Sequence, residues 1–305
     1  MTHQQDTLAY YAEAGAFTDF GQYADHSQYL PDSVPELVEV VQNLGIYDLF
    51  ARDFYGVTLS DDRMSHIHLR PVETMLEALF AVSDKALTET RTPNERIACR
   101  CHAFTKLIVS LLRAKGIPAR ARCGFGTYFG TGNYEDHWVC EYWNASDNRW
   151  VMIDAQLDAT WREKLGITWN TLDMNNEQFL VAGKAWQLCR NETVEPNRFG
   201  IGFVEGMHGL WFVAGNLVRD VAALNKMEML PWDVWGGAPA SATTFTDEQL
   251  AFYDELATLT LSPDSNLEAL QTRYQNDERL RVPEIIFNNL RQQTEPLIMP
   301  NTISL

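Results

Sequence analysis

The sequence predicts an α+β fold from three patterns in its middle part. Apolar residues recur at helical spacing after Cys101. Residues 119–125 then alternate apolar and polar side chains, as a strand does. Two further apolar segments flank the turn 144–148 and predict a β-hairpin. We therefore expect a mostly antiparallel sheet packed against a helix, with further helices at both ends of the chain.

The chain is expected to form a single domain over residues 1–305. No internal repeat or low-complexity linker divides it, and its 46% of hydrophobic residues can fill a large core. Three regions make up this domain: an N-terminal helical region, a central core, and a loop-rich and helical C-terminal region (1–90, 91–160 and 161–305).

Two helices are predicted in the N-terminal region, after an irregular arm over residues 1–30. The first follows a capping box at Ser33 and Glu36, and its apolar face consists of Leu37, Val40, Val41 and Leu44. The second spans about 72–87, with Met75, Leu76, Leu79 and Phe80 on one face. Between them, His66-Ile67-His68 alternates as a short surface strand would.

The central helix places Cys101 near its N-terminal end. Its buried stripe consists of Phe104, Leu107, Ile108, Leu111 and Leu112, and Lys115-Gly116-Ile117-Pro118 ends it. Unpaired amides and the positive end of the helix dipole would favour a thiolate at Cys101. A second capping box at Thr92–Glu95 offers an earlier start that would remove this activation, and both starts remain open.

The predicted hairpin supplies a histidine and an acid. A glycine-rich loop over 124–133, which lacks the dinucleotide-binding spacing and a following helix, leads into EDHWVCEYW. If Trp143 pairs with Arg149, His137 lies opposite Ala155, the residue after Asp154. A one-residue bulge in the hairpin would place His137 directly opposite Asp154. A thiol, a histidine and an acid are the parts of an activated cysteine nucleophile.

Three segments in order resemble the transglutaminase-like superfamily, within the papain-like cysteine enzymes. They are CRCHAFTKLIVSLLRAKGIPARARCGFG, DHWVCEYW and RWVMIDAQLD, about 65 residues in all. The resemblance implies a papain-like, transglutaminase-type catalytic core over 91–160. It assigns the nucleophile to Cys101, the histidine to His137 and the acid to Asp154.

The sequence also departs from that superfamily. Cys99 stands where glycine is common, and His102 replaces the tryptophan of the protein-crosslinking enzymes. Neither their calcium-site spacing nor the paired CxxC module of peptide N-glycanases is present. The resemblance therefore implies the triad and leaves the substrate open.

Other candidate residues have both a structural and a functional interpretation. Tyr128 and Tyr134 could donate to an oxyanion or gate access, and Trp138 could form a wall beside the histidine. Structural roles are expected for three cysteines, the arginines near the helix and the hairpin tryptophans: Cys123, Cys140, Cys189, Arg113, Arg120, Trp143 and Trp150. The role of Cys99 stays open, since it could be a packing residue or a partner that caps Cys101 on oxidation. A zinc site from Cys99, Cys101, His102 and Cys140 is the alternative to the nucleophile.

The C-terminal region is predicted to be loop-rich over 161–205. A packing helix follows at 207–228, and two capped helices begin at Thr246 and Ser262.

Composition restricts the class of function. With 24 basic and 41 acidic residues the formal charge is −17, which disfavours nucleic acids and anionic membranes as partners. The N-terminal sequence lacks signal-peptide features, and five scattered cysteines suit free thiols in a reducing cytoplasm.

We expect a cytoplasmic cysteine hydrolase or acyltransferase that acts on an amide bond through a thioester and needs no cofactor or metal. The alternative is a binding protein that keeps the fold without catalysis. The sequence does not specify the substrate, the second oxyanion donor or the oligomeric state.

Overall fold

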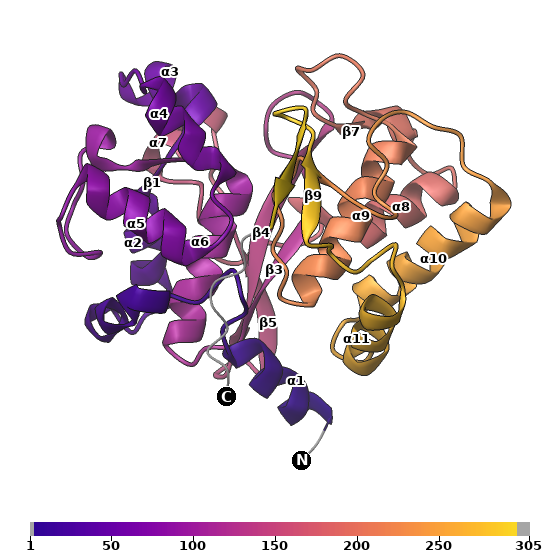
Figure 1. Cartoon of the computed structure of the whole chain (residues 1–305), viewed down its shortest axis with the longest axis horizontal. Coiled ribbons are helices and arrows are strands. Elements are labelled where there is room, and N and C mark those ends of the chain that lie inside the picture. Colours follow the sequence, from indigo (N-terminus) through magenta and orange to yellow (C-terminus); the bar gives the residue numbers. More distant parts are fainter. Residues whose placement is uncertain (1–2, 298–305) are drawn as a thin grey trace. The chain divides into compact units, whose positions relative to one another are not determined.

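The computed structural model describes residues 3–297 and combines helices with antiparallel and parallel strands, which confirms an α+β fold (Figure 1). Its described residues divide into two compact units. We call the first the α6 unit (8–121 and 139–174) and the second the α9 unit (3–7, 122–138 and 175–297). The expected single domain over 1–305 stays a prediction.

Helices and two short strands make up a large part of the α6 unit. In chain order the helices and 3₁₀ helices are η1 (Gly21–Tyr29), α2 (Val34–Leu44), η2 (Asp48–Phe50), α3 (Ala51–Tyr55), α4 (Asp61–Met64), η3 (Ser65–His68), α5 (Val72–Val82), η4 (Pro93–Glu95), α6 (Cys101–Ala114) and α7 (Ala159–Leu165). Strands β1 (Gly45–Tyr47) and β2 (Ile97–Cys99) pair in parallel. Helix α6 packs against α2 and α5.

The irregular arm expected over 1–30 is wrong for most of its length, and residues 1–2 lie outside the described residues. Helix α1 (His3–Ala12) and η1 occupy much of this segment. The Tyr11 side chain is fully buried, with its ring edge-on to Trp150 at 5.8 Å and the Arg120 guanidinium 5.3 Å from its centroid. Tertiary contacts thus hold a helix that has no apolar stripe of its own.

Helix α2 confirms the first predicted helix, because the Ser33 hydroxyl accepts a hydrogen bond from the Glu36 amide. Helix α5 is shorter than the predicted 72–87, since Ser83 is already extended. The predicted strand at 66–68 is wrong: η3 follows directly on α4 and buries Ile67.

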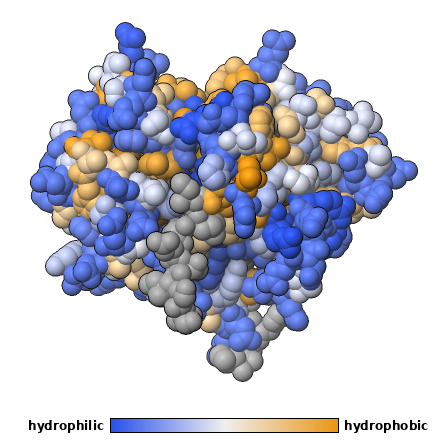
Figure 2. All heavy atoms as spheres, in the orientation of Figure 1, coloured by the Kyte–Doolittle hydropathy of each residue, from blue (hydrophilic) through white to orange (hydrophobic). Residues whose placement is uncertain are grey.

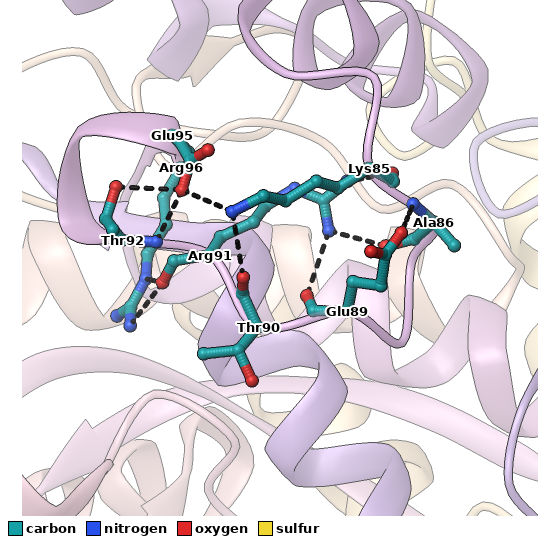
Figure 3. Close-up of polar contacts among 8 residues, drawn as sticks. All are labelled: Lys85, Ala86, Glu89, Thr90, Arg91, Thr92, Glu95 and Arg96. Atoms are coloured by element: carbon teal, nitrogen blue, oxygen red, sulfur yellow. Dashed lines mark hydrogen bonds and ion pairs between the residues drawn. The ribbon is translucent and has the colours of Figure 1, made fainter.

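A buried arginine organises the segment between α5 and β2 (Figure 3). Arg91 donates to the carbonyls of Ala86, at 2.9 Å, and Lys85. Glu95 accepts from the Lys85 ammonium and from both the amide and the hydroxyl of Thr92, each at 2.8 Å. These bonds fix the loop that leads through η4 into β2.

The largest sheet has five strands. Their order is β5-β4-β3-β6, with β7 pairing β4, and the strands are β3 (Ala119–Gly126), β4 (Tyr134–Asn144), β5 (Arg149–Ile153), β6 (Phe179–Val181) and β7 (Phe199–Gly200). The hairpin β4–β5 confirms the prediction. The register of the hairpin differs by one residue from the expected register, since Trp143 pairs with Trp150 rather than with Arg149.

Strand β3 is buried on both faces, although its polar phase was expected to contrast with its apolar one. Arg120 pairs with Glu141 at 2.6 Å and stacks 4.0 Å above the centroid of the Trp150 ring. Arg122 makes a bidentate pair with the buried Asp220. Buried charges on strands are tolerated when they are paired in this way. The bracing role expected for Arg120 is confirmed.

Arg113 also braces the core, but through hydrogen bonds. Its Nε donates to the Ala119 carbonyl at 3.0 Å, and a terminal nitrogen donates to the Thr18 hydroxyl at 2.7 Å. The segment 111–120 (LLRAKGIPAR) is therefore held by its own arginine.

Helices dominate the α9 unit. They are α8 (Ala182–Arg190), η5 (Pro196–Arg198), α9 (Leu210–Leu224), α10 (Asp247–Leu261) and α11 (Leu267–Asn276). Helix α9 packs against both α8 and α10, and its residues from Trp211 to Leu224 are all buried. A small antiparallel sheet has the order β10-β9-β8 and consists of β8 (Asp233–Val234), β9 (Ile285–Asn288) and β10 (Gln293–Pro296).

Two predictions for the C-terminal region need correction. The segment 161–205 is less loop-rich than expected, since it contains most of α7 and all of α8. The last helix begins at Leu267 rather than near Ser262, because Ser262 caps α10 and its carbonyl accepts from the Ser265 amide in a turn. Helix α10 confirms its capping box at Thr246 and Gln249.

Hydrophilic side chains predominate on the face shown in Figure 2, with smaller hydrophobic areas between them. Within residues 3–297, no helix has the length and apolar character needed to cross a bilayer.

Candidate functional site

Cys101 is the first residue of α6, which decides between the two helix starts left open by the sequence. Thr92 caps the short η4 instead of a long helix, and β2 separates η4 from α6. Arg100 is the N-cap residue, is extended (φ −122°, ψ 175°) and gives α6 no side-chain cap. The first amides of a helix have no partner within it, so Cys101 lies at the positive end of a 14-residue buried helix.

Cys99 differs from Cys101 in its surroundings. It ends β2, pairs with Tyr47 of β1 and is fully buried. A Cβ on Gly45 would lie 2.9 Å from its sulfur, so this thiol packs tightly against β1. Burial raises the pKa of Cys99, and the charge of Asp48 raises it further. The sequence left the role of Cys99 open, and the structure shows a buried residue packed against β1.

The three cysteines expected in the core are buried: Cys123, Cys140 and Cys189. Burial raises the pKa of Cys140, and it raises that of Cys189 to about 12, with a further contribution from Glu195.

His102, beside Cys101 in the sequence, is buried in α6. Burial lowers its pKa well below the usual value, and the nearby charges of Lys106 and Arg100 act in the same direction. The imidazole is therefore neutral near pH 7. Across residues 3–297, no group of three or more His, Cys, Asp or Glu side chains is arranged to hold a metal ion.

His137 lies on β4, buried in the α9 unit among aromatic rings. The ring centroids of Phe129, Tyr128 and Phe179 lie 5.0, 5.8 and 6.3 Å from that of His137, and all three rings are edge-on to the imidazole. These rings restrict the orientation of the imidazole. The sequence identified Tyr128 as a candidate but missed Phe129, its neighbour in the glycine-rich loop, and Phe179, which lies far away in the chain.

Tyr134 and Trp138 have different surroundings from Tyr128. Tyr134 stacks on Phe199 at 4.5 Å, with the Arg198 guanidinium 5.3 Å from its centroid, so its ring has a packing role. Trp138 is buried directly after His137.

Glu135 ties two glycine-containing loops of the α9 unit to β4. Its carboxylate accepts from the Thr131 hydroxyl at 2.6 Å and from the Gly202 amide at 2.8 Å. Thr127 anchors the first loop further, through its amide to the Gln178 carbonyl at 2.9 Å. The loop that carries Tyr128 is thus fixed at both ends.

Asp154 directly follows β5 and is buried in the α6 unit. Its carboxylate accepts from the Gln156 amide at 2.9 Å, and its own amide donates to the Thr171 carbonyl at 3.0 Å. The β4–β5 ladder ends at the pair Cys140–Ile153, one residue before Asp154. The backbone around this acid is therefore fixed on both sides.

The three residues of the predicted triad are distributed over both units, with Cys101 and Asp154 in the α6 unit and His137 in the α9 unit. Their joint action stays a prediction. Arg100 and Asp48, which form a bidentate ion pair next to Cys101, were missed by the sequence analysis.

Comparisons with known proteins bear on the central segment. A search of curated proteins and a search of solved structures each gave no significant match. A family model described as the transglutaminase-like superfamily matches residues 82–155. That range includes α6, β3, the hairpin β4–β5 and all three triad candidates. The resemblance inferred from the sequence is therefore confirmed for this segment: residues 82–155 match the transglutaminase-like superfamily.

Proposed function

We propose that this protein is a thiol-dependent enzyme, a hydrolase or acyltransferase acting on an amide or related acyl bond. One observation carries the proposal: Cys101 opens the buried helix of a segment that matches the transglutaminase-like superfamily. A helix N-terminus favours the thiolate, which is the reactive form of cysteine.

In the proposed reaction the Cys101 thiolate attacks the carbonyl carbon, and the resulting oxyanion accepts a hydrogen bond from the Cys101 amide. The His137 imidazolium, which carries the thiol proton, gives it to the leaving amine as the C–N bond breaks. Water completes a hydrolase cycle by cleaving the thioester, and an amine completes a transferase cycle. We favour hydrolysis because water is always present.

Asp154 is proposed to orient His137 and to stabilise its imidazolium. Residues 137 and 139 share one face of β4, because side chains alternate along a strand. Asp154 directly follows Ile153, which pairs with Cys140 on the same strand as His137, and this supports the role.

Tyr128 is the candidate for a further substrate contact, since its ring touches that of His137. The proposed partner is an amide-bearing substrate, with neither nucleic acid nor membrane involved, and the proposed compartment is the cytoplasm. No cofactor takes part in the proposed cycle.

The test is the pH dependence of iodoacetamide labelling, with each labelled cysteine identified by mass spectrometry. We expect Cys101 to be labelled rapidly near pH 6, and this labelling to vanish in Cys101→Ala. Labelling of Cys101 only above about pH 8, where an ordinary thiol ionises, would contradict the proposal and favour a non-catalytic binding protein.

Cys189 is the matched internal control. Its exposed fraction is 7% against 5% for Cys101, so access alone would label Cys189 at least as fast. Selective labelling of Cys101 would show that ionisation, rather than access, sets the rate. Stoichiometric zinc in the purified protein, lost in Cys101→Ala, would instead support the zinc alternative.

A further inference from the structure

Two glycines on β3 lie beside the strand that carries His137. Gly124 and Gly126 are two residues apart, so they share one face of β3, which neighbours β4 in the sheet. Neither glycine has a positive φ, so no unusual backbone conformation requires glycine at these positions. Glycine weakens the interior of a strand, and it often marks the close approach of another group. The space above Gly124 and Gly126 therefore explains why they are glycines.

Aromatic rings fill this space. A Cβ on Gly124 would lie 2.8 Å from the Phe179 ring, in addition to its contacts with the backbone of β6. A Cβ on Gly126 would lie 2.7 Å from a carbon of the Phe129 ring and 3.2 Å from one of the Tyr128 ring. The pairing of β3 with β6 also sets Phe179 opposite Gly126. Gly124 and Gly126 thus form a glycine floor that the rings contact.

The same rings contact the His137 imidazole. The ring centroids of Phe129 and Phe179 lie 5.0 and 6.3 Å from that of His137, at interplanar angles of 66° and 69°. His137 and Phe179 are buried, and Phe129 is half-buried. The loop that carries Phe129 is anchored on both sides, by the Thr127 amide and by the Thr131 hydroxyl. The imidazole therefore lies against rings that are themselves held in place.

We propose that Phe129, held between the glycine floor and His137, is a positioning residue that keeps the imidazole in one orientation for the proposed proton transfer. The inference rests on the proposed function and explains how its histidine is held. A catalytic group must stay within about 10–20° of its productive geometry, and side chains locked by packing provide this precision. A phenyl ring suits the role because it has no polar atom that would compete for the imidazole nitrogens.

The test leaves the ionisable groups near His137 chemically unchanged. In the α9 unit these are Glu135 and Asp136, which precede it on β4, and Tyr128, whose ring contacts the imidazole. The charges of Asp136 and His137 interact. Substitutions at Phe129 and Gly126 remove none of these groups.

The experiment measures the rate of Cys101 labelling by iodoacetamide across pH, because the proposed imidazole partner keeps this thiol ionised near pH 6. We expect Phe129→Leu to slow labelling at pH 6 by about tenfold, the effect of one unit in the thiol pKa. Phe129→Tyr keeps an aromatic ring in place and should retain most of the rate. Gly126→Ala keeps every ring but displaces that of Phe129, so it should also slow labelling.

A double-mutant cycle with His137→Ala tests whether Phe129 acts through the imidazole. In the His137→Ala background the ring has no imidazole to position, so Phe129→Leu should cause no further slowing. A further tenfold loss in that background would overturn the inference, because the ring would then act independently of His137. An unchanged labelling rate in Phe129→Leu with His137 intact would overturn it as well.

Phe245→Leu is the matched control. Phe245 is also half-buried in the α9 unit, and its ring packs against Trp186 of α8 and Tyr253 of α10, at 6.1 and 5.1 Å. This substitution should leave the pH profile of labelling unchanged. If wild-type Cys101 reacts rapidly at pH 6 and Phe129→Leu reacts equally rapidly, only the positioning role is refuted. Slow wild-type labelling would refute the proposed function and this role with it.

Discussion

The buried Arg122–Asp220 pair predicts a large loss of stability on a single isosteric change. Asp220 lies on α9 with none of its surface exposed, and Arg122 on β3 is 3% exposed. The pair is bidentate, at 3.1 and 2.9 Å. Asp220 also accepts from the Cys123 amide at 2.9 Å, and Arg122 donates to the Thr260 carbonyl at 2.9 Å.

We expect Asp220→Asn to lower the free energy of unfolding by about 3–5 kcal/mol. The asparagine keeps an oxygen for the Cys123 amide but leaves the Arg122 charge buried without a counter-charge. An uncompensated charge in a protein interior costs several kcal/mol, far more than one neutral hydrogen bond.

The matched control is Asp173→Asn, at a pair of similar geometry but different exposure. Arg149 and Asp173 are also bidentate, at 2.9 and 2.7 Å, yet their side chains are 46% and 43% exposed. Water screens such a pair, so its loss should cost at most about 1 kcal/mol.

Equilibrium urea unfolding, followed by far-UV circular dichroism and by tryptophan fluorescence, measures both differences. Two probes are needed because the chain divides into two units, each of which could unfold separately. Equal losses of stability in the two variants would refute the argument that burial sets the energetic importance of these pairs.

Two further predictions concern a capping carboxylate and a strand glycine. Hydrogen bonds to the Glu95 carboxylate, above all the one from Lys85, lower its pKa from 4.5 to about 2. The ionised carboxylate therefore stabilises the fold above pH 4.5, and this contribution is lost as the pH falls through about 2. Glu95→Gln should thus weaken the fall in melting temperature over this pH range, and an unchanged pH profile would contradict the assignment. Gly124→Ala should lower the free energy of unfolding, measured in urea, by about 1–3 kcal/mol, because the alanine Cβ would lie 2.1 Å from the Leu180 carbonyl oxygen. An unchanged free energy of unfolding in Gly124→Ala would refute this steric explanation.

Helices with either a capping box or a clear apolar stripe were mostly predictable from the sequence. Helices α2, α6 and α10 have such stripes or capping boxes, and each begins close to its expected residue. Among the helices that were missed, α1 and α8 lack a strong local start signal. Burial of Tyr11 against Trp150 is an example of the long-range contacts that stabilise such helices.

Strand pairing was predictable in kind but not in register. The turn residues predicted the β4–β5 hairpin, whereas the choice between Arg149 and Trp150 as the partner of Trp143 required the structure. A shift by one residue moves every side chain of a strand to the other face, so packing decides the register. Trp143 and Trp150 pack edge-on at 5.7 Å, a contact that favours the observed pairing.

For the candidate site too, some features follow from the sequence and others only from the tertiary structure. The sequence by itself determined which residues have the required chemistry, because the order of Cys101, His137 and Asp154 and the Arg113 segment lie in local motifs. Tertiary structure alone decided where α6 begins, since the competing cap at Thr92 is equally good locally and only the pairing of β2 with β1 interrupts a longer helix. It also decided the neighbours of the site, such as Asp48 beside Arg100, because contacts between residues 52 positions apart depend on packing and leave no periodic trace in the sequence.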